Sequence, residues 1–362
     1  MKFDFVIGNP PYQESKEKTK IQTQGNSNWI YQFFQTEADK ICNCSCLIYP
    51  FGGWFDSPES LNGLGNTILK DKHTISIRAY EGTSDRRAWY RTDKLPKPIF
   101  GNNANLSAGV SIVLRDRKMH DSIKYYNRVY SDDVVNIDTD MSDGLPPNPV
   151  FIKINSKIYG EKLCKQIKRG MFGIESNFVE LNPDKVSYNA SDWANPITLL
   201  TNDKSGSAGR ATYYKTDINN IPRGHEYISL YKVVITSAYP KKSIVSGIPT
   251  LANVKERLKT LIDVLEPNSA FGMSRLSLFM SKNKKECDNF IKYTQTNFFA
   301  GLTLQEPNRR STFGLIIPTQ DYTSNSDIDW DKSIEEIDKQ LYEKYNFTKD
   351  DIAFIENKRE VK

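Results

Sequence analysis

The chain has 362 residues, enough for two or three domains with their own hydrophobic cores. Its hydrophobic content of 38% and aromatic content of 12% are typical of a globular protein, and a net charge of +5 permits nucleic-acid binding where the cations are clustered. No apolar run is long enough to span a bilayer, and the first residues read as a strand carrying Asp4 rather than a signal peptide. We therefore expect a cytoplasmic protein with no membrane partner.

The sequence holds five cysteines, an odd number. Three of them, Cys42, Cys44 and Cys46, fall within one apolar segment, and we expect a strand there to direct them to different faces rather than toward one metal. We therefore predict no metal site, and reduced thiols in the cytosol are the simplest interpretation.

The first predicted element is a strand over residues 2–7, an apolar run that ends in Gly8. Open α/β folds place their chemistry at the point where a parallel strand leaves its sheet. The candidate catalytic residues are therefore those that follow this strand, namely Asn9, Pro10, Pro11 and Tyr12.

These four residues have the chemistry of a site for an amino group. The prolines fix the backbone, so the side-chain oxygen of Asn9 and the carbonyl oxygen of Pro10 can accept hydrogen bonds from one amino group. Because the lone pair of an exocyclic amine is delocalised into its ring, two acceptors around its hydrogens favour the tetrahedral, nucleophilic nitrogen of a transition state. Tyr12 offers a flat face for stacking. The alternative interpretation is a Pro-Pro turn with a packed tyrosine.

Helices and strands alternate in the region that follows. The predicted elements are a helix over 28–41, a strand over 45–50, a helix over 58–70, and strands over 74–80 and 108–114. Residues 1–118 therefore form an α/β region that is half of a doubly wound sheet.

Residues 119–155 are polar, rich in aspartate, and close in three prolines around Asn148, which indicates a linker. Residues 156–325 then change character and predict an α+β domain with long polar loops, suited to recognition. Its predicted elements are a helix over 156–168, strands over 197–200 and 231–236, and helices over 251–266 and 285–296.

Three loops of this domain combine cations with glycines, hydroxyls or aromatic rings, as DNA contacts require. The alternative for each loop is a solvated surface. The candidate DNA-binding residues are Lys204, Arg210, Lys215, Lys241, Lys242, Arg309 and Arg310.

Residues 326–362 predict a short tail of two amphipathic helices. Asp327, Asp329 and Asp331 imitate the start of a calcium loop, but Lys332 stands where that loop needs glycine. The three histidines are dispersed, and we predict no nuclease site.

Asn9-Pro10-Pro11-Tyr12 after an apolar strand resembles the catalytic motif of amino-group methyltransferases, especially the adenine-specific DNA methyltransferases of restriction-modification systems. The resemblance implies S-adenosylmethionine as cofactor, a target amino group bound by Asn9 and Pro10, and a flipped base stacked on Tyr12. The motif also occurs in enzymes that methylate RNA or protein, and cytosine amino methylation fits the same geometry.

The resemblance extends over the α/β region. The segment 46–54 is similar to the strand that follows the catalytic motif in these enzymes, and Phe100 with residues 108–111 is similar to their next segment. By this resemblance Phe51 lines the cofactor pocket and Phe100 lines the base pocket.

The glycine-rich loop and acidic residue that hold the cofactor in this family precede its catalytic motif, and no equivalent follows the motif here. The sequence therefore resembles the second half of a methyltransferase followed by a target-recognition domain. Expected partners are double-stranded DNA, a second polypeptide carrying the cofactor-binding half, and a cognate restriction endonuclease. The alternative is a catalytically silent DNA-binding specificity subunit.

Overall fold

The computed structural model divides the chain into two compact units, Met1–Tyr159 with Val361–Lys362, and Gly160–Glu360. The described residues are 3–11, 13–14, 28–50, 54, 60–80, 109–127, 134–138, 154, 156–158, 161–164, 170–206, 208–236, 250–305 and 316–356.

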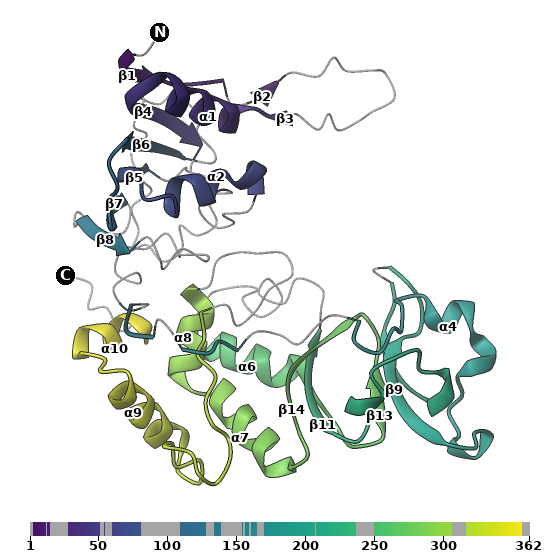
Figure 1. Ribbon diagram of the computed structural model, residues 1–362. Helices are drawn as coiled ribbons and strands as arrows, with labels where there is room; N and C mark the ends of the chain where they lie inside the picture. Colours follow the sequence, from purple (N-terminus) through teal and green to yellow (C-terminus); the bar gives the residue numbers. More distant parts are fainter. Residues whose placement is uncertain are drawn as a thin grey trace. The chain divides into compact units, whose positions relative to one another are not determined.

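The first unit is built on a six-stranded sheet in the order β1-β4-β6-β5-β7-β8 (Figure 1). β1 runs parallel to β4, β6 runs antiparallel to both β4 and β5, and β5 runs parallel to β7. Hence β1, β4 and β5 all point the same way. The strands are β1 (Phe3–Gly8), β4 (Cys42–Pro50), β5 (Thr74–Tyr80), β6 (Val110–Asp116), β7 (Ser122–Asn127) and β8 (Val134–Asp138), with a short β2 (Gln13–Glu14) and β3 (Asn28–Trp29) pair beside them.

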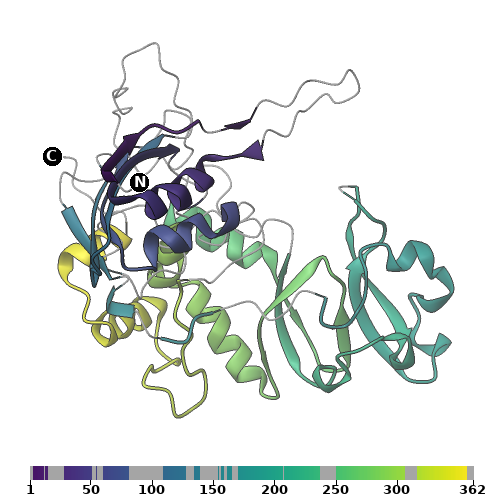
Figure 2. The same ribbon diagram turned by 45° about the horizontal axis from the view of Figure 1, so that its top comes forward.

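Two helices, α1 (Tyr31–Ile41) and α2 (Ser60–Leu69), lie side by side on one face of this sheet (Figure 2). They pack onto the buried face of β4, where Leu47 and Tyr49 alternate with half-buried residues as the period of a strand requires. The helices and strands predicted between residues 2 and 114 are confirmed, with ends shifted by a few residues.

The sheet continues beyond residue 118, where the sequence predicted a linker to begin. β7 and β8 both fall within the predicted linker and bury Ile123, Tyr125 and Ile137 in the same core as β4. Their apolar residues alternate with polar ones, and the surrounding aspartates hid this pattern.

The expected separation of the cysteines is wrong. Cys44 and Cys46 stand two residues apart on β4 and therefore share one face of the sheet. Cys42 lies at the junction of α1 and β4, where its thiol donates a hydrogen bond to the Ala38 carbonyl over 3.0 Å.

The second unit combines two three-stranded sheets, ordered β10-β9-β13 and β12-β11-β14, with a group of helices. β9, β13 and α4 lie at one end of this unit, α8, α9 and α10 at the other, and β11 and β14 between them (Figure 1). The strands are β9 (Pro196–Asn202), β10 (Ala211–Asp217), β11 (Tyr231–Thr236), β12 (Ile262–Leu265), β13 (Ser269–Phe271) and β14 (Arg275–Ser281). The helices are α4 (Phe178–Leu181), α6 (Leu251–Leu261), α7 (Lys284–Thr294), α8 (Asn297–Gln305), α9 (Ile334–Lys344) and α10 (Lys349–Ile355), with single 3₁₀ turns at Pro183–Lys185, Ala190–Asp192, Ile218–Asn220 and His225–Tyr227.

Two helices predicted for this unit end early. The helix predicted over 156–168 does not include residues 161–164, because Leu163 bridges Pro318 and the Cys164 amide donates to the Ile317 carbonyl over 2.7 Å. The helix predicted over 251–266 ends at Leu261, and the next four residues pair with β11 as β12. In both places a distant strand partner competes with the helical pattern.

The two predicted C-terminal helices are confirmed as α9 and α10, and each begins with a capping box, formed by Ser333 with Glu336 and by Thr348 with Asp351. They pack against α8 within the second unit. Across the described ranges, no helix is both long and apolar enough to cross a bilayer.

Candidate functional site

The candidate site lies at one edge of the six-stranded sheet, where β1, β4 and β5 end. Gly8 lies opposite Leu47 on β4, three residues before the end of that strand at Pro50. Pro50 and Tyr80, the last residues of β4 and β5, both lie opposite Val110 of β6. The chain therefore leaves the sheet at this edge after β1, after β4 and after β5.

The predicted catalytic residues follow the end of β1. Asn9 is exposed, Pro10 is buried and Pro11 is exposed, while Tyr12 lies outside the described residues. A proline has no N–H to donate to a sheet ladder, so the strand ends before this pair. The buried Pro10 holds the backbone next to an accessible carboxamide, which is the arrangement expected of a preorganised acceptor.

At the end of β4, buried aromatic residues fix the chain where it leaves the sheet. The Trp54 indole is fully buried and donates a hydrogen bond to the Pro50 carbonyl over 2.8 Å. The Tyr49 hydroxyl donates to the Gln35 carboxamide oxygen over 2.7 Å, and burial raises the pKa of Tyr49 well above its ordinary value. These contacts fix Pro50 and Trp54, which flank residues 51–53 in the sequence. Phe51, predicted to line a cofactor pocket, lies outside the described residues.

The end of β5 is followed by residues 81–108, which include Phe100, predicted to line a base pocket. Phe100 lies outside the described residues. The flanking residues Tyr80 and Gly109 both lie at the same edge as Asn9, so the segment starts and returns there. The Tyr80 ring packs edge-on against Tyr126, with ring centroids 6.2 Å apart.

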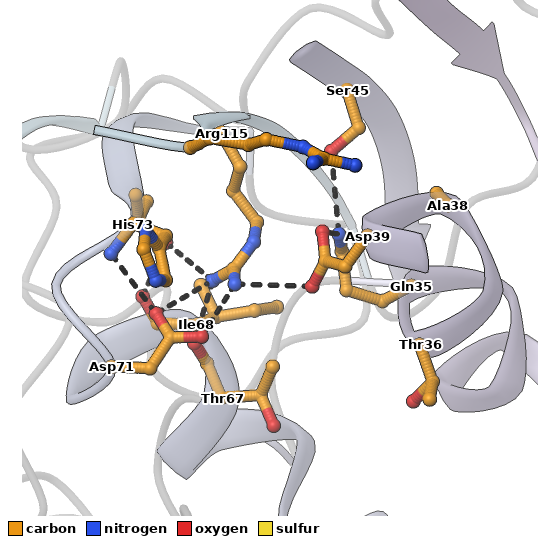
Figure 3. A network of polar contacts seen from close by, with 12 residues as sticks. Gln35, Thr36, Ala38, Asp39, Ser45, Thr67, Ile68, Asp71, His73 and Arg115 are labelled. Carbon is orange, nitrogen blue, oxygen red and sulfur yellow. Dashed lines mark hydrogen bonds and ion pairs between the residues drawn. The ribbon is translucent and has the colours of Figure 1, made fainter. Parts of the chain in front are cut away.

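The opposite edge of the sheet carries a polar network that the sequence analysis missed (Figure 3). Arg115 on β6 is only 2% exposed, and its guanidinium donates to both carboxylate oxygens of Asp71 and to Asp39 over 3.1 Å. It also donates to the Thr67 carbonyl over 2.6 Å and to the Thr74 hydroxyl over 2.9 Å. The network joins α1, α2 and β6 and lies away from the candidate site, so its role is structural. The sequence feature that could have indicated this network is the single arginine within the apolar strand of residues 110–116.

The second unit contains the described candidate DNA contacts. Lys204 and Arg210 are exposed and flank the tip of the hairpin between β9 and β10. Asp203 accepts a hydrogen bond from the Arg210 amide over 2.7 Å, and Glu180 accepts one from the Ser205 amide over 2.9 Å. These backbone hydrogen bonds lower the pKa of both carboxylates, so the hairpin tip carries two anions beside its two cations.

The structure brings together only part of the predicted DNA-binding set. Lys215 lies five residues further along β10 than Arg210, about 17 Å along the strand, and its ammonium group donates to the Thr198 hydroxyl over 2.9 Å. Lys241, Lys242, Arg309 and Arg310 lie outside the described residues.

One exposed aromatic residue near this hairpin was missed from the sequence. The Tyr188 ring is 72% exposed and stacks on Tyr214 of β10, with centroids 5.3 Å apart. Tyr213, on the other face of β10, is 51% exposed. Within the described ranges, no group of three His, Cys, Asp or Glu residues is placed to hold a metal ion.

Three solved structures of restriction-modification proteins resemble this chain weakly. A chain of a type I R-M system shares 11% identity and a TM-score of 0.23 over 38% of this chain and 26% of that chain. The type IIL restriction-modification enzyme MmeI, solved in complex with DNA, shares 8% identity and a TM-score of 0.38 over 98% of this chain and 56% of MmeI. A nuclease-deletion mutant of the type ISP restriction-modification enzyme LlaGI, solved with a DNA substrate mimic, shares 12% identity and a TM-score of 0.33 over 91% of this chain and 34% of LlaGI.

The chain thus spans between about a quarter and just over half of the length of these solved chains. No curated protein sequence matches it significantly. Residues 1–85, which include β1, Asn9, α1, β4 and β5, match the model of the Eco57I restriction-modification methylase family, and this part of the chain is therefore similar to a restriction-modification methylase.

Proposed function

We propose that this chain provides the target-amino site and the DNA-recognition region of a DNA methyltransferase in a restriction-modification system. The observation that carries the proposal is the exposed Asn9 beside the buried Pro10 at the carboxyl end of a parallel strand, within the residues that match a methylase family. The substrate is the exocyclic amino group of an adenine turned out of the DNA duplex.

The residues of this chain bind and orient that amino group. The carboxamide oxygen of Asn9 and the carbonyl oxygen of Pro10 each accept one N–H, which draws electron density toward the nitrogen and favours its tetrahedral form. The prolines limit backbone motion, so the acceptors need no reorganisation during the reaction. Tyr12 stacks on the flipped base, and Phe100 contributes to the same pocket because its segment starts and ends at this edge.

The methyl donor is S-adenosylmethionine, and Phe51 contacts it in this proposal. The described residues do not by themselves fit this cofactor. An adenosyl group needs a crevice between the carboxyl ends of two adjacent strands and a glycine-rich turn. Among the described residues, Asn9 has a neighbouring strand on the β4 side alone, and no glycine-rich turn follows a parallel strand. We therefore assign to this chain the amino-group chemistry and, of the binding of the donor, the contact from Phe51 alone.

The second unit supplies the contacts to DNA in this proposal. Lys204 and Arg210 are exposed at the hairpin between β9 and β10, where the Arg210 guanidinium donates to the Ala208 and Gly209 carbonyls over 3.2 Å each. In this proposal both cations contact phosphates or base edges. Lys215 and the pairs Lys241–Lys242 and Arg309–Arg310 extend this set. The acidic neighbours Asp203 and Glu180 reduce the net charge of the hairpin, which favours specific contacts over general attraction to phosphate.

The alternative function is a specificity subunit that binds DNA and transfers no methyl group. It is favoured by the incomplete cofactor site of the described residues. Methyl transfer to cytosine, RNA or protein uses the same acceptor geometry and differs in substrate.

The test is transfer of a radiolabelled methyl group from S-adenosylmethionine to unmethylated double-stranded DNA, with RNA of the same sequence in a parallel reaction. The purified chain is assayed alone and together with the polypeptide encoded directly ahead of it in its source genome. Label in N6-methyladenine supports the proposal, and label in a cytosine amino group corrects the base. DNA binding without label under either condition leaves the specificity subunit as the function.

A further inference from the structure

The second unit contains a cavity between α7, the segment 322–331 and α9. Its volume is about 450 Å³, which lies in the range of small-ligand sites. Helices α7 and α9 contact each other (Figure 1), and the segment is tied to both. The Lys292 ammonium on α7 donates to the Trp330 carbonyl over 2.6 Å, and the Asp329 amide donates to the Gln340 carboxamide oxygen on α9 over 2.7 Å. The walls of the cavity are therefore preformed.

Asn289 lines this cavity from α7 and is 4% exposed. Its carboxamide nitrogen donates to the Tyr322 carbonyl over 2.9 Å. Because a carbonyl can only accept, the atom turned away from Tyr322 is the carboxamide oxygen. This oxygen is enclosed, and no described residue donates a hydrogen bond to it. Native structures normally satisfy buried polar atoms, so the cavity calls for a ligand that donates an N–H or O–H.

The rim of the cavity is acidic. One cation, Lys285, lines it together with four carboxylates, those of Glu286, Asp327, Asp329 and Asp331. Two of these carboxylates are neutralised by ion pairs. Lys285 lies 2.6 Å from Asp331, and Lys344 lies 2.8 Å from Asp327.

The other two carboxylates keep their negative charge. Glu286 accepts a hydrogen bond from the Ser281 hydroxyl over 2.6 Å, and Asp329 accepts one from the Asp331 amide over 3.1 Å. In the part of the chain that the structure describes, neither forms an ion pair. The surrounding residues 321–344 include eight acidic and three basic residues, although the whole chain has a net charge of +5. Such a surface repels phosphate and attracts cations, so the expected ligand is a cation rather than DNA.

The walls indicate which kind of cation fits. No three acidic side chains within the described ranges are placed to hold a metal ion, so the cation is organic. Tyr322 and Trp330 also line the cavity, with ring centroids 5.4 Å apart. A guanidinium is planar, stacks on aromatic rings, is weakly hydrated and has five N–H donors, whereas an ammonium is compact and strongly hydrated. Aromatic walls, carboxylates and an enclosed acceptor together favour the guanidinium.

We propose that this cavity binds a guanidinium group carried on an alkyl chain, with one N–H donated to the Asn289 oxygen and the charge neutralised by Glu286 and Asp329. The group belongs either to an arginine side chain of a polypeptide or to a small molecule such as agmatine, because both present the same chemistry. The site lies within the second unit and does not rest on methyl transfer.

The test is a titration of the full chain, labelled with ¹⁵N at its tryptophan indoles and followed by NMR. The Trp330 indole donates to the Asp321 carbonyl and the Ser326 hydroxyl, so its resonance reports on the segment that lines the cavity. Trp330→Phe assigns this resonance. The probes are N-acetyl-arginine methylamide, agmatine, N-acetyl-lysine methylamide and N-acetyl-citrulline methylamide. We expect saturable shifts with the two guanidinium probes and at least tenfold weaker binding of the lysine and citrulline probes.

Two variants test the residues that contact the ligand. The double variant Glu286→Gln, Asp329→Asn keeps the size of both side chains and removes their charge, and we expect it to bind the guanidinium probes at least tenfold more weakly. Asn289→Ala removes the enclosed acceptor and should have a similar effect, with the other indole resonances unchanged as evidence that the fold is kept.

The matched control is the double variant Glu335→Gln, Asp350→Asn. It removes the same charge from two exposed residues of α9 and α10 that do not line the cavity. We expect binding within twofold of the parent chain. Equal weakening in the two double variants would show general attraction to an acidic surface and overturn the site.

The remaining outcomes are also decisive. Tighter binding of agmatine than of the arginine derivative supports the site with a small molecule as its ligand, and equal or tighter binding of the arginine derivative supports it with a polypeptide. Equal affinity for the lysine probe, or no saturable shift with any probe, would overturn the proposal.

Discussion

Arg115 donates hydrogen bonds from both terminal nitrogens to the two carboxylate oxygens of Asp71, and this pair joins β6 to the connection between α2 and β5 (Figure 3). The same guanidinium reaches Asp39 on α1, whose other carboxylate oxygen accepts from Gln35 over 2.7 Å. The carboxylates hold the guanidinium in its charged form and raise its pKa despite burial. One buried cation thus fixes both helices to the sheet.

Replacing Arg115 with methionine should destabilise the first unit. Loss of a buried partner typically costs about 3–5 kcal/mol, but both carboxylates are one-third exposed, so we expect about 2–3 kcal/mol. Native-state hydrogen exchange of the β4 and β6 amides measures this change for one unit alone. Lys124→Met, on the exposed face of β7, is the control and should stay within about 0.5 kcal/mol. Equal protection of the β4 and β6 amides from hydrogen exchange in the two variants would contradict the structural role of Arg115.

Replacing Asn9 with alanine should remove methyl transfer from the complex and leave the fold intact, because Asn9 is exposed. Loss of one preorganised polar group typically slows a reaction by about 100–1000-fold. We expect that loss in the rate of methylation, with duplex affinity in a fluorescence anisotropy titration unchanged within twofold. Asn43→Ala, at the opposite end of β4, should keep full activity. An equal loss of DNA binding and methylation in the Asn9 variant would remove Asn9 from the chemistry.

Replacing Lys204 and Arg210 with alanine should weaken DNA binding and reduce its salt dependence. Each phosphate contact contributes about 0.9 to the slope of log K against log salt, so we expect a decrease of about 1.8. Titrations between 50 and 200 mM salt, over which the Debye length falls about twofold, measure the slope. Lys118→Ala in the first unit is the control. An unchanged slope would support the alternative interpretation, in which the hairpin is a solvated surface loop.

The pair Arg309 and Arg310 lies outside the described residues and carries the same prediction. Their joint replacement with alanine should lower DNA affinity and decrease the salt slope by about 1.8. If affinity falls while the slope is unchanged, these arginines affect the fold of the second unit rather than contact phosphate.

Asp338 should make the stability of the second unit depend on pH. It caps α8 by accepting hydrogen bonds from the Asn297 and Phe298 amides, each over 2.8 Å. Burial nevertheless raises its pKa to about 6, against about 3.9 in an unfolded chain. Between these values the folded unit holds more protons than the unfolded chain, so the free energy of unfolding decreases as pH rises from about 4 to 6.

The size of this effect is on the order of 2–3 kcal/mol, since one pKa unit corresponds to about 1.4 kcal/mol. The free energy of unfolding of the second unit is measured by urea denaturation at pH 4.0, 5.0, 6.0 and 7.0, with hydrogen exchange of the α8 amides as the readout. Asp338→Asn should flatten the dependence, and Asp350→Asn, an exposed residue at the start of α10, should leave it unchanged. The same slope in both variants would contradict the assignment.

The sequence alone determined the elements whose patterns are local. The strand before Asn9, the helices α1 and α2, and the strands β4, β5 and β6 follow from apolar periodicity within 6 to 14 residues, which each element shows by itself. The resemblance to restriction-modification methylases also follows from such short segments, and it is confirmed at the level of the family for residues 1–85.

Only the tertiary structure decided the features that depend on distant partners. Residues 161–164 pair with 317–318 and not with their own helix, and residues 262–265 leave α6 to pair with β11, because a strand partner satisfies their backbone groups. Likewise, the sequence named Asn9 and Pro10, but strand order places the ends of β1, β4 and β5 at one edge of the sheet. Strand pairing joins residues far apart along the chain, so local propensity does not specify it.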